Sequence, residues 1–99
     1  MIPAGDVIID EGHPCLPGHF PGRPIVPGAL LLAKIFARLA EAHPGFIVVG
    51  LEQAKFLRPV RPGEVLALAS RISEGGRVHF NGMIGDATGL RGVALMHSV

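Results

Sequence analysis

The sequence predicts a single α+β domain, in which one antiparallel sheet wraps around one central helix. A chain of 99 residues has room for one hydrophobic core, so we expect residues 1–99 to form one domain. One segment in the first half of the chain carries a convincing helical pattern. The residues after Pro44 form apolar-rich runs separated by glycine- and proline-containing turns, which is typical of antiparallel strands.

The first part of the chain combines a short strand, a long loop and the helix. We expect a strand at residues 6–10 and an extended loop at residues 11–28, where glycine and proline are frequent. A loop of this length in a small domain usually serves a function. The helix is expected at about residues 28–42, because Pro27 has a backbone angle suited to a helix start and Pro44 follows its end.

The expected helix has three different faces when its residues are placed 100° apart. A narrow polar stripe contains Lys34, Arg38 and Glu41. A broad apolar face contains the large side chains, namely Leu31, Leu32, Ile35, Phe36 and Leu39. The third face contains only small residues, namely Ala29, Ala33, Ala37 and Ala40. A helix with so little polar surface is expected to be mostly buried.

The strands expected after the helix lie at residues 46–56, 64–73, 77–86 and 90–98. Gly75 and Gly76 are typical of a hairpin turn, and Thr88 with Gly89 separates the last two strands. The prolines of residues 56–63 cannot donate to a central ladder, so this segment is expected to be a tight connection.

The composition excludes some classes of protein and favours an oligomer. The net charge is +1 and 17% of residues are charged, which argues against a nucleic-acid-binding protein. Hydrophobic residues make up 48% of this short chain, so we expect a homo-oligomer, most simply a two-fold dimer. Cys15 has no partner for an intrachain disulfide. No membrane-spanning segment or signal peptide is evident, which favours a cytoplasmic protein.

The loop and the start of the helix contain a candidate catalytic pair. The first N–H groups of a helix lack internal acceptors, so the amide of Gly28 could stabilise negative charge on a carbonyl oxygen. His19 lies in a frame of glycines and prolines and could carry a proton beside that oxygen. Such a pair suits removal of a proton next to a thioester carbonyl. The alternative is a loop histidine that caps a carbonyl.

Other chemically active side chains support weaker hypotheses. His13, Cys15 and His19 do not have the spacing of a common zinc site, so no metal is expected. Cys15 fits a small packed or exposed thiol better than a nucleophile. His43 suits the helix C-terminus, where a cation is favoured.

The remaining histidines and a basic cluster fit surface roles. His79 and His97 occupy alternating strand positions, which suits the surface or a dimer face. Lys55, Arg58 and Arg61 surround one turn. Such a cluster is usually a solvated surface, although it could also contact an acidic partner.

Two segments resemble the bacterial β-hydroxyacyl-ACP dehydratases, the FabA/FabZ family, which have the hot-dog fold. Residues 19–28, HFPGRPIVPG, closely resemble the active-site motif of that family. Residues 55–64, KFLRPVRPGE, resemble its K-F-x-x-P-V-x-P-G-[DE] segment. The two motifs have the right order and separation, with the expected helix between them. The resemblance covers nearly the whole chain and implies a hot-dog fold.

The resemblance implies a lyase of fatty-acid or polyketide-like synthesis that needs no cofactor. His19 would remove the α-proton of a 3-hydroxyacyl thioester, and the Gly28 N–H would hold its carbonyl oxygen. The acyl chain would enter a tunnel at the dimer interface. The residues expected beside it are Phe20, Pro21, Ile25, Val26, Pro27, Ala29 and Ala33. Lys55, Arg58 and Arg61 could contact an acidic acyl carrier protein, and coenzyme A is the alternative carrier.

One departure from the family pattern leaves three functions open. The family places a glutamate or aspartate fourteen residues after the motif histidine, and this chain has Ala33 there. The first function is a dehydratase that works through His19 and Gly28, weakened by the missing acid. The second is an incomplete subunit that pairs with a homologous dehydratase supplying the acid. The third is an acyl thioesterase, which ranks last because no carboxylate is placed to activate water.

Overall fold

The computed structural model describes residues 1–13 and 25–99. Within these ranges the chain forms one α-helix, five strands and one short 3₁₀ turn. In chain order they are β1 (Ile2–Val7), α1 (Gly28–Ala42), β2 (Phe46–Phe56), β3 (Leu66–Ser73), η1 (Glu74–Gly76), β4 (Arg77–Ile84) and β5 (Ala87–Ser98). The predicted α+β class is confirmed.

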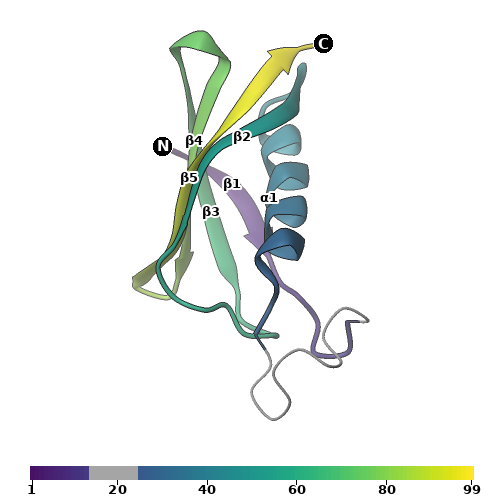
Figure 1. Ribbon diagram of the computed structural model, residues 1–99, viewed down its shortest axis with the longest axis vertical. Helices are drawn as coiled ribbons and strands as arrows, with labels where there is room; N and C mark the ends of the chain where they lie inside the picture. Colours follow the sequence, from purple (N-terminus) through teal and green to yellow (C-terminus); the bar gives the residue numbers. More distant parts are fainter. Residues whose placement is uncertain (14–24) are drawn as a thin grey trace.

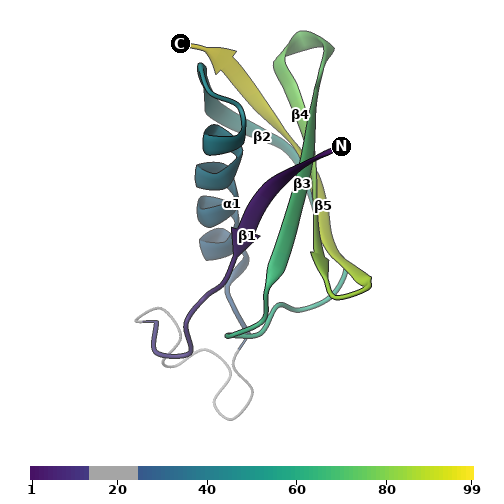
Figure 2. The same cartoon turned by 180° about the vertical axis from the view of Figure 1, so that it is seen from behind.

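The strands form one antiparallel sheet in the order β1-β3-β4-β5-β2. β1 and β2 are therefore the two edges, although they flank the helix in sequence. α1 lies along one face of this sheet, and no helix of the described ranges covers the opposite face (Figure 1). The view from behind shows β1 passing close to α1 (Figure 2). The predicted arrangement of one sheet around one helix is confirmed.

The core lies between α1 and the facing side of the sheet. Leu31, Ile35 and Leu39 are the buried residues of α1. Alternate residues of the central strands bury their side chains against them, as the two-residue period of a strand requires. These are Leu66 and Leu68 of β3, Val78 and Phe80 of β4, and Leu90, Ala94 and Met96 of β5.

The prediction of a mostly buried helix is wrong for the single chain. Ala29, Ala33 and Ala37 are exposed, because a single sheet covers only one side of a helix. The large apolar residues are divided as well, since Leu32 and Phe36 are only partly buried. The alanine face of α1 is therefore surface in the monomer.

The first strand differs most from its prediction. It covers Ile2–Val7 instead of residues 6–10, because its register with β3, from Ile2 opposite Ser70 to Val7 opposite Leu66, sets its extent. An irregularity in that register lies between Pro3 and Asp6, where Gly5 has a φ of 88°. Glycine tolerates this left-handed conformation, so the strand can bulge there.

The other strands match their predictions with shifted ends. β2 covers Phe46–Phe56 as predicted. β3 starts at Leu66, because the preceding turn is closed by the bond from Glu64 N to Arg61 O. β4 ends at Ile84, and β5 already starts at Ala87 because the turn uses Gly85, with a φ of 59°. Thr88 and Gly89 therefore lie inside β5.

The predicted turn between β3 and β4 is confirmed, with positive φ values of 77° at Gly75 and 72° at Gly76.

Of the helices in the described parts of the chain, none combines the length and apolar character that crossing a bilayer requires.

Candidate active site

The N-terminus of α1 has the features of an anion-stabilising helix end. Pro27 is the N-cap residue, with φ −58° and ψ 139°, and it provides no side-chain hydrogen bond to the helix. Its carbonyl accepts the first helical bond, from Leu31 N at 3.1 Å. The N–H groups of the first turn point away from the helix and carry its positive dipole end. No acidic residue of this turn competes for them.

A pocket of about 380 Å³ opens beside this helix end. It is lined mainly by apolar side chains from two segments that are distant in sequence, namely Ile25, Val26, Gly28 and Leu31, and Phe56, Leu57, Arg58, Pro59 and Val60. A bond of 2.8 Å from Val26 N to Val60 O joins the two segments. An apolar pocket with a few amide donors suits a ligand with an acyl chain and one carbonyl group.

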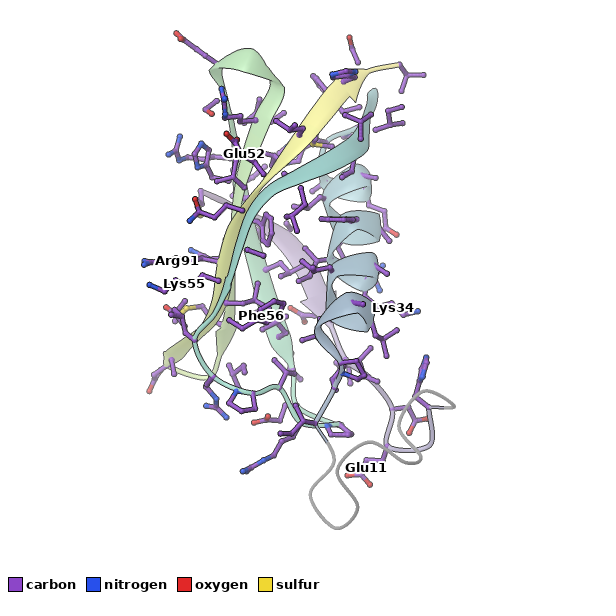
Figure 3. All side chains as sticks on the ribbon, viewed as in Figure 1. Glu11, Lys34, Glu52, Lys55, Phe56 and Arg91 are labelled. Atoms are coloured by element: carbon purple, nitrogen blue, oxygen red, sulfur yellow. The ribbon has the colours of Figure 1, made fainter. Side chains whose placement is uncertain are left out.

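The Phe56 side chain extends from β2 toward α1 (Figure 3), and its ring packs against Gly28. A Cβ atom at position 28 would lie 3.2 Å from the Phe56 Cζ atom, which is closer than ordinary contact. The missing side chain at position 28 therefore leaves room for the Phe56 ring as well as for a ligand that approaches the Gly28 amide. Phe56 remains 46% exposed and forms part of the pocket wall.

The segment after Phe56 is held by hydrogen bonds at several points. Leu57 N and Arg58 N both donate to Gly89 O, at 2.8 and 3.2 Å. Arg58 Nη2 donates to Glu64 Oε2 at 3.1 Å, and the other oxygen of this carboxylate accepts from Arg61 N at 2.8 Å. These bonds hold the pocket wall in place. The Glu64 carboxylate also offsets part of the positive charge of Arg58.

The three basic residues that were predicted to surround one turn do not form a single cluster. Arg58 lines the pocket beside α1. Lys55 precedes Phe56 in β2, so its side chain points to the opposite face of the sheet. There it lies in register with Arg91 of β5. Arg61 is exposed in the connecting segment.

The predicted site residues fall into three groups. His19, Phe20 and Pro21 lie outside the described residues, as does Cys15. Ile25, Val26 and Gly28 line the pocket, whereas Pro27 caps α1 and both Ala29 and Ala33 are exposed on it. Sequence reasoning missed five lining residues, namely Leu31, Phe56, Leu57, Pro59 and Val60. The second motif contained the last four, but only its basic residues were assigned a binding role.

The nearest acidic residue on α1 is engaged elsewhere. Glu41 accepts two hydrogen bonds from Arg38 Nη1, at 3.1 and 3.2 Å. Arg38 is fixed in turn, since its Nε donates to Asp6 O at 2.9 Å. Glu41 therefore does not replace the carboxylate that is missing at Ala33.

Three histidines of the described residues occupy structural or surface positions. His43 is buried at the C-terminal end of α1, and its Nε2 lies 2.8 Å from the Ser70 hydroxyl. His79 is partly buried on the face away from α1, and its Nε2 lies 2.9 Å from the Ser73 hydroxyl. His97 is exposed near the end of β5.

Comparison with known sequences gives a consistent result. The family described as "ApeI-like: ApeI dehydratase" matches residues 4–90. A 3-hydroxyacyl-[acyl-carrier-protein] dehydratase FabZ from Thermomicrobium roseum is 39% identical over 89 residues, covering 82% of this chain and 56% of the relative. The FabZ of Paracidovorax citrulli is 38% identical over 98 residues, covering 83% and 65%. The chain thus spans somewhat more than half the length of these relatives.

Comparison with solved structures supports the same fold. The dehydratase heterocomplex ApeI:P from Xenorhabdus doucetiae matches with a TM-score of 0.73 and 26% identity, covering 92% of this chain and 82% of that chain. An uncharacterised protein from Erwinia carotovora subsp. atroseptica matches in fold, with a TM-score of 0.67 and 20% identity over 99% of this chain. The predicted hot-dog fold and the resemblance to FabA/FabZ dehydratases are confirmed.

Proposed function

Because the chain belongs to the ApeI-like dehydratase family, we propose that it converts a 3-hydroxyacyl thioester into a trans-2-enoyl thioester and water. The observation that carries this proposal is the apolar pocket of about 380 Å³ at the N-terminus of α1. It offers an acyl chain an apolar wall and offers a thioester carbonyl the amide of Gly28. The FabZ relatives are named as dehydratases of 3-hydroxyacyl groups on acyl carrier protein.

In this mechanism His19 and Gly28 divide the work. His19 takes the α-proton, and the electron pair of that C–H bond moves toward the carbonyl. The Gly28 N–H and the dipole of α1 stabilise the negative charge that develops on the carbonyl oxygen. The enolate then expels the 3-hydroxyl group, which leaves as water once it has gained a proton. Ala33 supplies no acid for that last proton, so it comes from water or from a partner chain.

We propose that the active form is a two-fold dimer whose subunits meet along β2. Within the described residues β2 is an edge strand, so one row of its backbone groups has no strand partner there. It also carries exposed apolar side chains, with Ile47 51%, Val49 48% and Leu51 41% exposed. A second copy, or a homologous subunit, would cover these side chains and the alanine face of α1.

The proposal is tested by supplying the purified protein with a short-chain 3-hydroxyacyl thioester and, separately, with the enoyl product. Enoyl absorbance and free thiol are followed independently. We expect reversible enoyl formation that is lost in His19→Ala and retained in His97→Ala, which removes an exposed histidine from the end of β5. Thiol release without enoyl formation would instead identify a thioesterase.

A second candidate is an incomplete subunit that pairs with a homologous dehydratase. Its supporting observation is the exposed Ala33 of α1, together with an acidic residue, Glu41, that is already paired with Arg38. The related ApeI:P protein of known structure is described as a heterocomplex. In this case His19 of this chain would act with an acid from the partner. Turnover that requires an added homologue would favour this candidate over the homodimer.

Substitution at Ala33 separates the two candidates. Ala33→Glu restores the family's acid at an exposed position, so we expect faster hydration of the enoyl thioester by this chain alone, by about 10²-fold or more. Ala37→Glu, one turn further along the same face, is the matched control: it adds the same carboxylate to the proposed subunit contact and should not raise the rate. Equal rates for a folded Ala33→Glu variant and the unmodified protein would contradict the assignment of position 33.

A further inference from the structure

The face of the sheet that points away from α1 carries two neighbouring cations. Lys55 of β2 and Arg91 of β5 are directly opposite each other in the antiparallel register, and both are exposed. Their side chains extend side by side away from the helix (Figure 3). Like charges directly opposite each other in a sheet are destabilising. This arrangement therefore becomes favourable when an anion lies between the two side chains.

Three other arginines of the described residues already have such an anion within the chain, whereas Arg61 and Arg71 do not. Arg38 pairs with Glu41, Arg58 with Glu64, and Arg77 with Glu52, at N–O distances of 2.7 to 3.1 Å. Within residues 1–13 and 25–99, neither Lys55 nor Arg91 forms a salt bridge. The positive charge of this pair is therefore available to a ligand.

A second pocket, of about 370 Å³, lies beside Arg91 on the same face. Its lining includes the polar side chains of Gln53, His79, Asn81, Thr88 and Arg91. Asn81 and Thr88 donate to the sulfur atoms of Met1 and Met83, and His79 bonds to Ser73, so Gln53 and Arg91 are the lining side chains with no internal hydrogen bond among the described residues. Asn81 is paired with Arg91 in the register of β4 and β5, so Arg91 lies between Asn81 and Lys55. The size of this pocket suits part of a small molecule better than a flat protein contact.

We propose that Lys55 and Arg91 bind a phosphate group, with the adjacent pocket holding the group to which the phosphate is attached. An arginine fork and a lysine point charge together match the several oxygens of a phosphate. The biological reason rests on the proposed function, because coenzyme A and acyl carrier protein both present their thioester on a phosphorylated pantetheine arm. Lys55 directly precedes Phe56 at the end of β2, and its side chain lies on the opposite face of the sheet, so the pantetheine arm would pass around this end of the sheet to bring the thioester into the acyl pocket.

Binding is measured directly by titrating the full chain with three probes while recording amide resonances or heat. The probes are inorganic phosphate, adenosine 3′,5′-bisphosphate (the nucleotide end of coenzyme A) and a phosphopantetheine-modified carrier protein. We expect Arg91→Ala and Lys55→Ala each to weaken binding of the preferred organic probe roughly tenfold or more. Raising the salt concentration should weaken it too, because both cations are exposed. Preference for the bisphosphate identifies coenzyme A as the source, and preference for the modified carrier identifies the protein.

Two controls separate this site from the proposed catalytic function. Lys34→Ala removes an exposed lysine on α1 and should bind every probe as the unmodified chain does. His19→Ala should lose turnover but keep phosphate binding, so failure of one proposal is distinguishable from failure of the other. Equal affinities in the unmodified chain and Arg91→Ala, or no binding of any probe at millimolar concentration, would overturn the phosphate site.

Discussion

The two ends of α1 differ in how the backbone groups without helical partners are satisfied. At the C-terminal end, His43 N donates to Leu39 O at 3.0 Å and Phe46 N donates to His43 O at 3.2 Å. The His43 ring bonds to Ser70, and these two residues are 9% and 0% exposed. At the N-terminal end, Pro27 provides no side-chain cap and a pocket opens beside Gly28.

The difference shows which end stabilises the fold and which end is available for chemistry. A buried polar group without a partner costs about 1–3 kcal/mol, so the buried end needs every hydrogen bond that it makes. An open helix start bears a smaller cost, because solvent or a ligand can satisfy its amides. Substitutions at the two ends should therefore affect different measurements.

The largest effect is expected from removing the amide hydrogen of Gly28. Gly28→Pro deletes this donor while keeping a residue that suits the first helical position, and the backbone angles of Pro27 are compatible with a following proline. We expect turnover to fall about a hundred- to a thousandfold. Gly28→Ala places a similar Cβ against Phe56 but keeps the N–H, and it should lose much less. Equal losses in both variants would show that crowding, and not the donor, matters.

At the opposite end, Ser70→Ala should affect stability rather than catalysis. It leaves a buried imidazole nitrogen without its partner, so the free energy of unfolding should fall by about 1–3 kcal/mol. Urea unfolding at one fixed protein concentration measures this loss. Ser73→Ala breaks a similar bond to the half-exposed His79 and should cost about 1 kcal/mol or less. A drop in turnover per folded Ser70→Ala molecule would contradict the division between the two ends.

Phe56→Ala should enlarge the pocket at the N-terminal end of α1 and lower the stability of the fold only modestly. The ring is 46% exposed, so its truncation should lower the free energy of unfolding by about 1–2 kcal/mol. Phe80→Ala, which removes a ring that is 1% exposed in the core, should cost about 3–5 kcal/mol. We expect Phe56→Ala alone to change the preference for acyl chain length, measured as kcat/KM across a substrate series. An unchanged preference would exclude Phe56 from the acyl-binding wall.

The smallest effect on stability is expected from the ion pair of Arg77 and Glu52, which lies away from both ends of α1. Hydrogen bonding and charge from Arg77 lower the pKa of Glu52 below its ordinary value of 4.5. This ion pair therefore contributes stability above that pH and loses it as the pH falls through the lowered pKa. Glu52→Gln should flatten the pH dependence of urea unfolding below about pH 4.5, by less than Ser70→Ala lowers stability at neutral pH. A larger effect would mean that this exposed pair is coupled to the core.

Some features of the site were predictable because they depend on neighbouring residues. Pro27 and Gly28 marked the helix start, and β2 was predicted with its observed ends because its apolar run is bounded by a glycine turn and a proline-rich segment. The chemistry assigned to Gly28 likewise follows from its position at a helix N-terminus. Local chain geometry sets all of these features.

Other features depend on residues that meet only in the folded chain. β1 was predicted too late in the sequence, because its pairing with β3 sets its extent. Three contacts join segments that are distant in the sequence. Phe56 packs against Gly28, Val26 bonds to Val60, and Lys55 lies beside Arg91. The charges of residues 55–61 suggested one cluster, although successive strand residues point to opposite faces.

The sequence by itself determined the α+β class, the helix with its open N-terminus, and the absence of an acid at position 33. It could do so because helix capping, residue periodicity and residue identity are local properties of the chain. Only the tertiary structure decided which side chains form the pocket wall, which end of α1 is buried, and that two cations lie together on the far face. Those outcomes follow from strand order and register, through which distant residues satisfy each other's hydrogen bonds and apolar surfaces.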